Sequence, residues 1–540
     1  MPSRRTYAIA GASLLATTLT LGCMKATANA ANTVAVQAAV PPKLIVFITV
    51  DQLRGDMLDR YRADLHSGYA RLMSGAWFVN GYQDHAITET APGHASTMSG
   101  RFPRNTGITS NLTGVIDPNY QLIDAANGEV GASPVRFNGT TLYDWLKARD
   151  ARSKAFSASK KDRGAILPIG RSKANVYWYS GNGNFTTSTY YRDTLPTWVQ
   201  QFNARHLGQR YAGRAWTLSR DPSTYAEPDS VPFENNGRDF LFPHALPEDS
   251  TVVTRVLPAT PFMDSVTALF ALEAARQLEL GAGPQTDLLA VSFSATDYVG
   301  HAYGPDSREA HENEIRLDQT IGWFIDSLYR MRDSSTIVFA LTGDHGSSPI
   351  PELARARGEA KGNEGLRVNL RPLVAQVRAG LRAAGADTNA FFYDFETVSL
   401  DRAALSAAKL NADSILNAFA AAAKAVPGVW RVDRIRDLRR VDPAVDPFAR
   451  RWSHQIPEKS AVELVITLTR YSNYGGIPAT HGSPWDQDAS VPIIFYGPWF
   501  KPGRYTQFAR VVDMAPTLAA IAAVRPLEKL DGVALLQATR

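Results

Sequence analysis

Three long apolar runs constrain the fold of this 540-residue chain more than any other feature of its sequence. They cover residues 44–50, 287–293 and 336–342, and they consist mostly of Val, Ile, Leu, Phe and Ala. Continuous apolar runs of this length are typical of strands that are buried on both faces of a parallel sheet. Residues 262–280 and 305–330, on either side of the second run, have apolar residues at helical spacing. Strands separated by helices predict an α/β fold with right-handed crossovers.

An aspartate follows each of these runs directly or within a few residues, and a histidine follows that aspartate closely after the second and third runs. A further histidine lies in a glycine-containing loop near the carboxyl end of the chain. The carboxyl ends of parallel strands meet at one edge of a sheet, where ligands bind. Each residue alone is explained equally well by a helix cap or an ordinary histidine, whereas six at one edge favour metal binding. Mixed imidazole and carboxylate ligands suit zinc better than magnesium or calcium. The six candidates are Asp51, Asp297, His301, Asp344, His345 and His481.

A short polar segment, Thr-Glu-Thr-Ala-Pro-Gly-His at 88–94, has the composition of a helix entrance. Pro92 suits the first helical turn, and Gly93 permits close approach of another backbone. A helix N-terminus has free N–H groups and a partial positive charge, so it can bind a phosphate or sulfate oxygen beside the Thr90 hydroxyl. Taken alone, the segment is better explained as an ordinary turn with a capping threonine, for which Thr88 would also serve.

Together these motifs resemble the alkaline phosphatase superfamily and, within it, the bacterial periplasmic monoesterases with a threonine nucleophile. The matching stretches keep the family's order along nearly the whole chain: Thr-Val-Asp-Gln-Leu-Arg-Gly-Asp (49–56), Thr-Ala-Pro-Gly-His-Ala-Ser (90–96), Asp-Tyr-Val-Gly-His (297–301), Asp-His-Gly (344–346) and Ala-Thr-His-Gly (479–482). The resemblance implies a three-layer α/β sandwich with a central, mostly parallel sheet and cap or crown insertions.

The resemblance also implies two zinc ions per chain and a covalent phosphothreonine intermediate on Thr90, formed and hydrolysed by in-line displacements at phosphorus. The implied ligands of one ion are Asp297, His301 and His481. Those of the other are Asp51, Asp344 and His345, with Thr90 able to bridge toward it.

Three further residues resemble the phosphate-binding residues of the threonine-type monoesterases. Lys161 and Arg163 match a Lys-x-Arg pair, and Asn111 lies twenty-one residues beyond Thr90, like that subgroup's asparagine. These donors would complement a monoester dianion, which presents more charge on oxygen than a diester. A solvated charged turn is the plain alternative for the Lys-x-Arg pair, and Lys160 is a neighbouring lysine that could occupy the same register.

Residues 1–30 resemble an export leader, with two early arginines, a mostly apolar stretch at 7–21 and no acidic residue. Two exits are open. Ala28-Asn29-Ala30 is a small-x-small cleavage site, whereas Leu21-Gly22-Cys23 resembles the end of a bacterial lipobox, which would make the only cysteine of the chain a lipid anchor. We therefore expect an exported protein that is periplasmic, anchored to the outer membrane or secreted.

The rest of the chain, 41–540, is expected to form one catalytic domain with insertions at about 165–260 and 355–475. The first insertion lacks periodicity and is expected to cap the sheet edge. The second is expected to contain an alanine-rich helix at 405–425 and a half-exposed antiparallel strand at 462–470.

We expect small phosphate monoesters as substrates, broad specificity and an alkaline optimum. The formal charge of +5 falls to +2 without the leader, which gives no support for a nucleic-acid partner. One alternative is a nucleotide pyrophosphatase/phosphodiesterase of the same superfamily, which would share the metal ligands and Thr90 but lack the Lys-x-Arg pair. Another is an inactive exported protein that binds metal or phosphate. A sulfatase would need Cys or Ser at position 90. The oligomeric state stays open.

Overall fold

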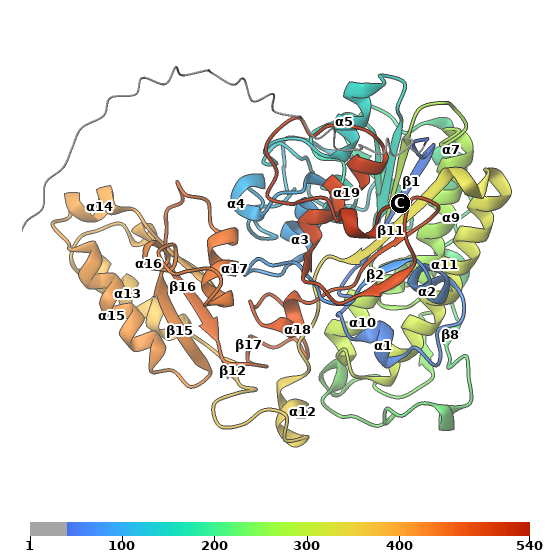
Figure 1. Ribbon diagram of the computed structural model, residues 1–540. Helices are drawn as coiled ribbons and strands as arrows, with labels where there is room; N and C mark the ends of the chain where they lie inside the picture. Colours follow the sequence, from blue (N-terminus) through green and yellow to red (C-terminus); the bar gives the residue numbers. More distant parts are fainter. Residues whose placement is uncertain (1–39) are drawn as a thin grey trace, which may run out of the picture. The chain divides into compact units, whose positions relative to one another are not determined.

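The first apolar run forms β1 (Leu44–Val50), at the centre of the main sheet. β10 (Asp287–Phe293) and β11 (Ile337–Gly343) pair with it on either side, both in parallel, which confirms the predicted sheet. This computed structural model describes residues 40–540 (Figure 1). The leader at 1–30, including Cys23, lies outside the described residues.

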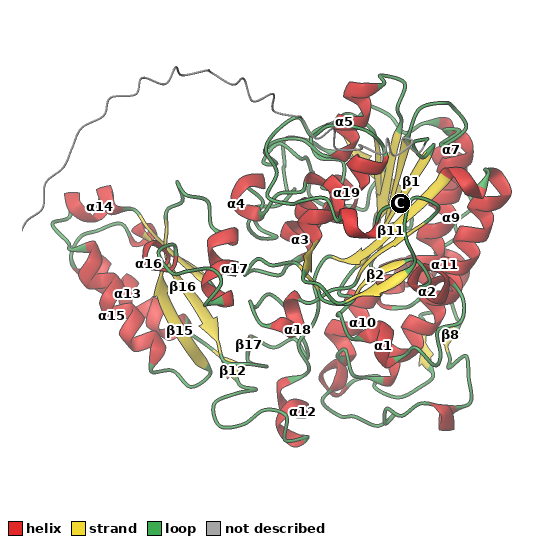
Figure 2. Cartoon of the chain, in the orientation of Figure 1, coloured by secondary structure: helices red, strands yellow, loops and turns green. Residues whose placement is uncertain are grey.

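The main sheet has ten strands, drawn in yellow in Figure 2, and its five consecutive strands from β11 to β6 run in parallel. The antiparallel strands β18 and β7 flank this parallel centre. In spatial order the strands are β19 (Gly503–Tyr505), β2 (Ala76–Phe78), β18 (Ile493–Tyr496), β11, β1, β10, β5 (Ala155–Ser159), β6 (Asn175–Tyr179), β7 (Phe185–Ser188) and β4 (Leu122–Ile123).

Helices cover both faces of the sheet, which gives the expected three layers. Along β1 the side chains alternate between two apolar clusters: Val46 and Ile48 belong to one, Ile45 and Phe47 to the other. Full burial of such side chains stabilises the fold by roughly 1.5–3 kcal/mol each. The first cluster contains residues of α2 (Gly68–Met73), α9 (Phe262–Gln277), α10 (Ala295–Tyr303) and α11 (Arg308–Met331). The second contains residues of α3 (Thr90–Ser99), α5 (Leu142–Arg149), α6 (Asp162–Ile166) and α19 (Met514–Ile521).

The segment at 165–260 is not a cap throughout, because it supplies β6 and β7 to the main sheet. Its remaining elements pack against the α9 and α11 side, where Trp216 and Leu257 are fully buried. These elements are α7 (Thr197–Asn203), β8 (Ala215–Trp216), β9 (His244–Ala245) and α8 (Ser250–Val256). Aromatic residues of this segment, Trp216 among them, therefore belong to the main core, although the segment shows no regular apolar spacing.

The segment at 355–475 forms a second, antiparallel sheet of four strands. Their order is β13 (Phe391–Asp394), β14 (Thr397–Leu400), β16 (Val462–Leu468) and β15 (Val429–Arg434). The sheet packs against α13 (Arg371–Ala383), α14 (Arg402–Ala407) and α15 (Ala412–Lys424). The short helices α16 (Ile435–Leu438) and α17 (Pro447–Gln455) pack with Val465 on its other side.

Two local predictions for this segment are wrong. The strand at 462–470 is antiparallel but mostly buried, because Leu464 and Ile466 face the α13 and α15 cluster while Val465 packs against α16 and α17. The alanine-rich helix is two helices, because the chain turns at Lys409, whose φ of 59° is left-handed.

Among residues 40–540, no helix combines the length and the apolar character needed to cross a membrane.

Candidate active site

The register of the three central strands brings the predicted acidic residues together. Val50 lies level with Phe293 on one side and with Gly343 on the other. Asp51 directly follows Val50, and Asp344 directly follows Gly343. Asp297 lies in the first turn of α10, just beyond β10. All three carboxylates are buried.

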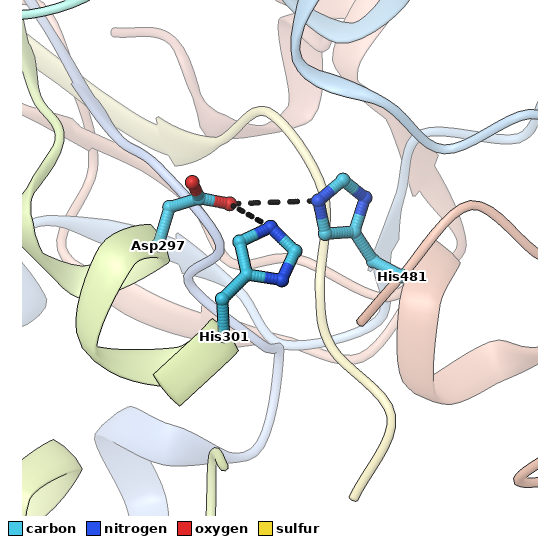
Figure 3. A group of neighbouring side chains, drawn as sticks. All are labelled: Asp297, His301 and His481. Atoms are coloured by element: carbon cyan, nitrogen blue, oxygen red, sulfur yellow. Dashed lines mark ion pairs between the residues drawn. The ribbon is translucent and has the colours of Figure 1, made fainter. Parts of the chain in front are cut away.

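Asp297, His301 and His481 converge on one point, as Figure 3 shows. Asp297 and His301 are four residues apart on α10 and therefore share a helix face, whereas His481 comes from the loop after β17 (Asn473–Tyr474). Nε2 of His301 is 3.3 Å, and Nε2 of His481 3.5 Å, from Asp297 Oδ1. The three potential ligand atoms lie within 4.8 Å of one another, a spacing that one metal ion can bridge.

Backbone carbonyls fix the orientation of the three imidazoles. The Nδ1 atoms of His301, His345 and His481 lie 2.9, 3.0 and 2.7 Å from the carbonyl oxygens of Ala479, Gly346 and Thr88, respectively. A carbonyl only accepts hydrogen bonds, so Nδ1 carries a proton, and Nε2 is the nitrogen available to a cation between the imidazole and the carboxylates. This is the tautomer that a metal ligand needs.

A second group of potential ligands consists of Asp51, Asp297 and His345. It differs from the predicted set in one member, because Asp297 takes the place expected for Asp344. Asp344 lies beside the group, with Oδ2 3.7 Å from His345 Nε2, and its Oδ1 accepts a hydrogen bond from the backbone N–H of Gln52. Burial lowers the pKa of His345 to about 3, so its imidazole is neutral at physiological pH.

Thr90 is the first residue of α3, and its side chain is buried at the same sheet edge. Its Oγ1 lies 3.4 Å from His345 Nε2 and 3.3 Å from the Lys161 ammonium, which donates a hydrogen bond to it. Pro92 occupies the first turn, where its missing N–H leaves no partner unpaired. The threonine oxygen therefore lies at a helix N-terminus, beside His345 of the second ligand group and the Lys161 ammonium.

Lys161 follows β5 and lies among the acidic side chains instead of in a solvated turn. Its Nζ is 2.7 Å from Asp51 Oδ2 and 2.5 Å from Asp297 Oδ2. Burial opposes the charge of the ammonium, but the two carboxylates raise the pKa of Lys161 overall. The neighbouring Lys160 points elsewhere and donates to the carbonyl of Tyr179.

Asn111 and Arg163 lie at the border of this group. Asn111 Oδ1 accepts a hydrogen bond from the N–H of Ala91, and its own N–H donates to Glu89, so it fixes the start of α3. Arg163 is in α6, where burial lowers its pKa but Asp162 and the charges of the acidic cluster raise it overall. Its Nε atom has no hydrogen-bond partner within residues 40–540.

Two residues that we did not predict as site residues support the ligands. Gln52, with a left-handed φ of 65°, donates from Nε2 to Asp297 Oδ1 over a distance of 3.0 Å. His94, in α3, places Nδ1 3.1 Å from Asp344 Oδ2, and its Nε2 lies 3.1 Å from Ser292 Oγ. The strained backbone of Gln52 follows from aiming both its N–H and its side chain at carboxylates.

The charge of the cluster fits divalent cations. Three buried carboxylates face one ammonium, and burial together with Asp297 and Asp344 raises the pKa of Asp51 well above its usual range. Neither oxygen of Asp51 accepts a hydrogen bond of good geometry from residues 40–540. Buried charge of one sign is costly unless it is paired or coordinates a metal. The oxygens and the inward-facing Nε2 atoms form a donor set suited to zinc.

Comparisons with known proteins identify relatives of this chain. The sequence profile of the type I phosphodiesterase / nucleotide pyrophosphatase family matches residues 45–441. The chain is 30% identical to the alkaline phosphatase PhoV of Synechococcus elongatus over 90% of both proteins. It is also 30% identical to the alkaline phosphatase PhoK of a Sphingomonas species, over 92% of this chain and 91% of that protein.

Among solved structures, the crystal structure of the alkaline phosphatase PafA is similar, with a TM-score of 0.84 and 26% sequence identity. The match covers 93% of this chain and 99% of that one. A second PafA structure carries substitutions of a threonine, an asparagine, a lysine and an arginine. Two spacings among these four residues are the same in this chain. In both proteins an asparagine lies twenty-one residues beyond the threonine, as Asn111 does beyond Thr90, and an arginine lies two residues beyond the lysine, as Arg163 does beyond Lys161.

Proposed function

The chain belongs to the type I phosphodiesterase / nucleotide pyrophosphatase family of the alkaline phosphatase superfamily, and we propose that it is a zinc-dependent alkaline phosphatase that hydrolyses phosphate monoesters through Thr90. The observation that carries the proposal is the position of Thr90 Oγ1, between the Lys161 ammonium at 3.3 Å and His345 Nε2 at 3.4 Å. A hydroxyl held by a cation and beside metal ligands is an activated nucleophile.

Two zinc ions would be held by the two potential ligand groups, with Asp344 beside the second. One set is Asp297, His301 and His481, and the other is Asp51, Asp297 or Asp344, and His345. When bound, such ions lower the pKa of a hydroxyl or water and stabilise charge on the attacking and leaving oxygens.

The residues of the chain supply the rest of the chemistry. Thr90 Oγ1 forms the new bond to phosphorus while the bond to the leaving oxygen breaks, and the alcohol departs. Water then attacks the phosphothreonine and releases inorganic phosphate, which restores the Thr90 hydroxyl. The charge of Lys161, whose ammonium donates to Thr90 Oγ1, complements the oxygens of the phosphoryl group. Two in-line displacements give net retention of configuration at phosphorus.

The preference for monoesters over diesters rests on Lys161 and Arg163. A monoester carries one more negative oxygen than a diester, and a buried ammonium with a nearby guanidinium complements that charge. A nucleotide pyrophosphatase/phosphodiesterase activity is the second candidate, because the matching family profile has that description. Burial of Lys161 within 3.3 Å of Thr90 favours the monoesterase.

The test is a comparison of p-nitrophenyl phosphate with bis-p-nitrophenyl phosphate, before and after treatment with a chelator. We expect a higher kcat/KM for the monoester, loss of activity with the chelator, and recovery with zinc. Faster turnover of the diester would favour the second candidate. Activity that survives complete removal of zinc would exclude the proposed cofactor, and no activity on either ester would favour an inactive binding protein.

Export is part of the same proposal and rests on the composition of residues 1–30. Fractionation of cells that express the full chain tests it, since an exported enzyme hydrolyses substrate outside the cytoplasmic fraction. Labelling with a radioactive fatty acid in the wild type and in Cys23→Ala separates a lipid anchor from simple cleavage.

A further inference from the structure

A cavity of about 230 Å³ opens directly beside the proposed reaction site. His481 is one of its lining residues and also one of the potential metal ligands of the first group. Glu89, the residue before Thr90, lines it as well, and its Oε2 accepts the N–H of Asn111. The cavity therefore adjoins the proposed site through Glu89 and His481.

The far wall of the cavity comes from the 355–475 segment and is aromatic and acidic. Phe395 and Tyr474 form a pair with ring centroids 5.5 Å apart and planes at 55°. Phe395 is 42% exposed, so part of its ring is accessible from the cavity. Glu396 lies next to it, so the cavity combines aromatic faces with the carboxyl groups of Glu89 and Glu396. A third carboxyl group of the lining, that of Asp488, already accepts hydrogen bonds from Ser348 and Ser483.

Of the Glu89 and Glu396 carboxyl groups, that of Glu396 has no basic partner within residues 40–540, whereas His481 and Arg163 partly offset the charge of Glu89. Burial and the Glu89 carboxylate raise the pKa of Glu396 well above its usual range, and no basic side chain of residues 40–540 counteracts this effect. The nearness of two like charges in a half-buried cavity is unfavourable unless a cation lies between them.

Two further polar groups of the wall have no partner. The Asn473 side chain is 5% exposed and lines the cavity, yet its Nδ2 makes no hydrogen bond within residues 40–540. The buried hydroxyl of Tyr474 is also without a partner in this part of the chain. Buried polar groups are normally satisfied, but both atoms are shielded from the cavity itself, so they do not define the chemistry of its ligand.

We propose that this cavity binds the leaving alcohol of the substrate and selects alcohols that carry a positively charged amine. The inference rests on the proposed function, because it places the alcohol of a phosphate monoester in the cavity. An ammonium group there lies near the two carboxyl groups and against the faces of Phe395 and Tyr474. Carboxylates and aromatic rings both attract cations, the rings by about 0.5–2 kcal/mol when the cation is desolvated.

The test compares two esters of the same shape and different charge. One is phosphocholine, and the other is neohexyl phosphate, in which carbon replaces the quaternary nitrogen. The ratio of their kcat/KM values is measured in the wild type, in Glu396→Gln and in Phe395→Leu. The ammonium also makes choline the better leaving group in any active site, so the change of this ratio between wild type and variant is the diagnostic quantity.

We expect a wild-type ratio above one that falls about three- to tenfold in Glu396→Gln, because one of the two carboxylates is lost. It should fall about two- to fivefold in Phe395→Leu, which keeps an apolar side chain but removes the aromatic face. The matched control is Glu458→Gln, which removes the same charge from an exposed site of the same segment and should leave the ratio unchanged.

A ratio that is the same in the wild type and in both cavity variants would overturn the inference, as would a wild-type preference for the neutral ester. Phe395 is exposed, so Phe395→Leu tests the inference even if Glu396→Gln does not fold. Hydrolysis of neither ester, nor of p-nitrophenyl phosphate, would contradict the proposed function itself. Hydrolysis of both esters with no ratio change would contradict only the selection of amines.

Discussion

Gly93 of α3 packs directly against the main chain of Asp344: a Cβ atom on Gly93 would lie 2.1 Å from the Asp344 carbonyl oxygen. The helix that begins with Thr90 is thereby held against the residue that follows β11. The threonine and the metal-binding edge are positioned by one backbone contact, which only glycine allows.

Gly93→Ala should displace α3 and with it Thr90. We expect at least a tenfold loss of kcat and a loss of stability of about 1–3 kcal/mol, because the added methyl group overlaps a backbone atom that cannot move freely. Steady-state kinetics and urea unfolding measure the two effects. The control is Gly380→Ala in α13, where nothing lies within 4 Å and where alanine should be neutral or slightly stabilising. Equal kcat values and equal unfolding free energies for Gly93→Ala and Gly380→Ala would show that the contact between Gly93 and Asp344 does not position α3.

Lys161→Ala should reduce monoester hydrolysis by about 10²–10³-fold, the usual effect of losing one preorganised donor. Diester hydrolysis should fall less, because a diester presents less negative charge to the lost ammonium. Lys160→Ala is the control, since its ammonium donates to a carbonyl outside the site. Equal losses for both substrates would show that Lys161 serves the acidic cluster and not the phosphoryl group.

The central strands and the convergence of the acidic residues could be predicted because both follow from local pattern. The runs that end near Val50, Phe293 and Gly343 are typical of buried parallel strands, and such strands bring the residues after them to one edge. The i, i+4 spacing of Asp297 and His301 likewise predicts one helix face.

The remaining features depend on contacts between distant segments. Lys161 lies among the carboxylates only because β5 pairs with β10, and no local signal gives that pairing. Gln52 supports Asp297 from a left-handed backbone conformation. Glutamine rarely adopts this conformation, so the residue type gives no sign of it in the sequence. The break at Lys409 escaped prediction because alanine-rich sequences favour helix on both sides of it.

Metal removal should destabilise the protein as well as inactivate it, because the carboxylates of Asp51, Asp297 and Asp344 would face one another with only one ammonium between them. We expect a lower unfolding temperature after chelation and recovery with zinc. His301→Ala should retain less zinc per chain by elemental analysis, whereas His206→Ala, an exposed histidine, should retain the wild-type amount. Unchanged zinc content in His301→Ala would remove that residue from the site.

Glu314 of α11 should make stability fall as the pH rises. Burial raises its pKa from an ordinary 4.5 to about 8, and the charges of Asp264 and Asp318 add to this effect. The folded state thus binds a proton that the unfolded state has lost between pH 4.5 and 8, so stability declines across that window.

Glu314→Gln keeps an oxygen that can accept from the Tyr69 hydroxyl but does not titrate. Relative to this variant, the wild type should lose on the order of a few kcal/mol between pH 5 and 8, as measured by urea unfolding. Parallel pH profiles for the two proteins would show that Glu314 titrates at its ordinary pKa.

The most direct measurement is identification of the phosphorylated residue after acid quenching during turnover. With p-nitrophenyl phosphate as substrate, peptide mass spectrometry should find one added phosphoryl group on Thr90 in the wild type and none in Thr90→Ala, whose turnover should be largely abolished. A phosphoryl group on another residue, or full turnover by Thr90→Ala, would contradict the assignment of the nucleophile.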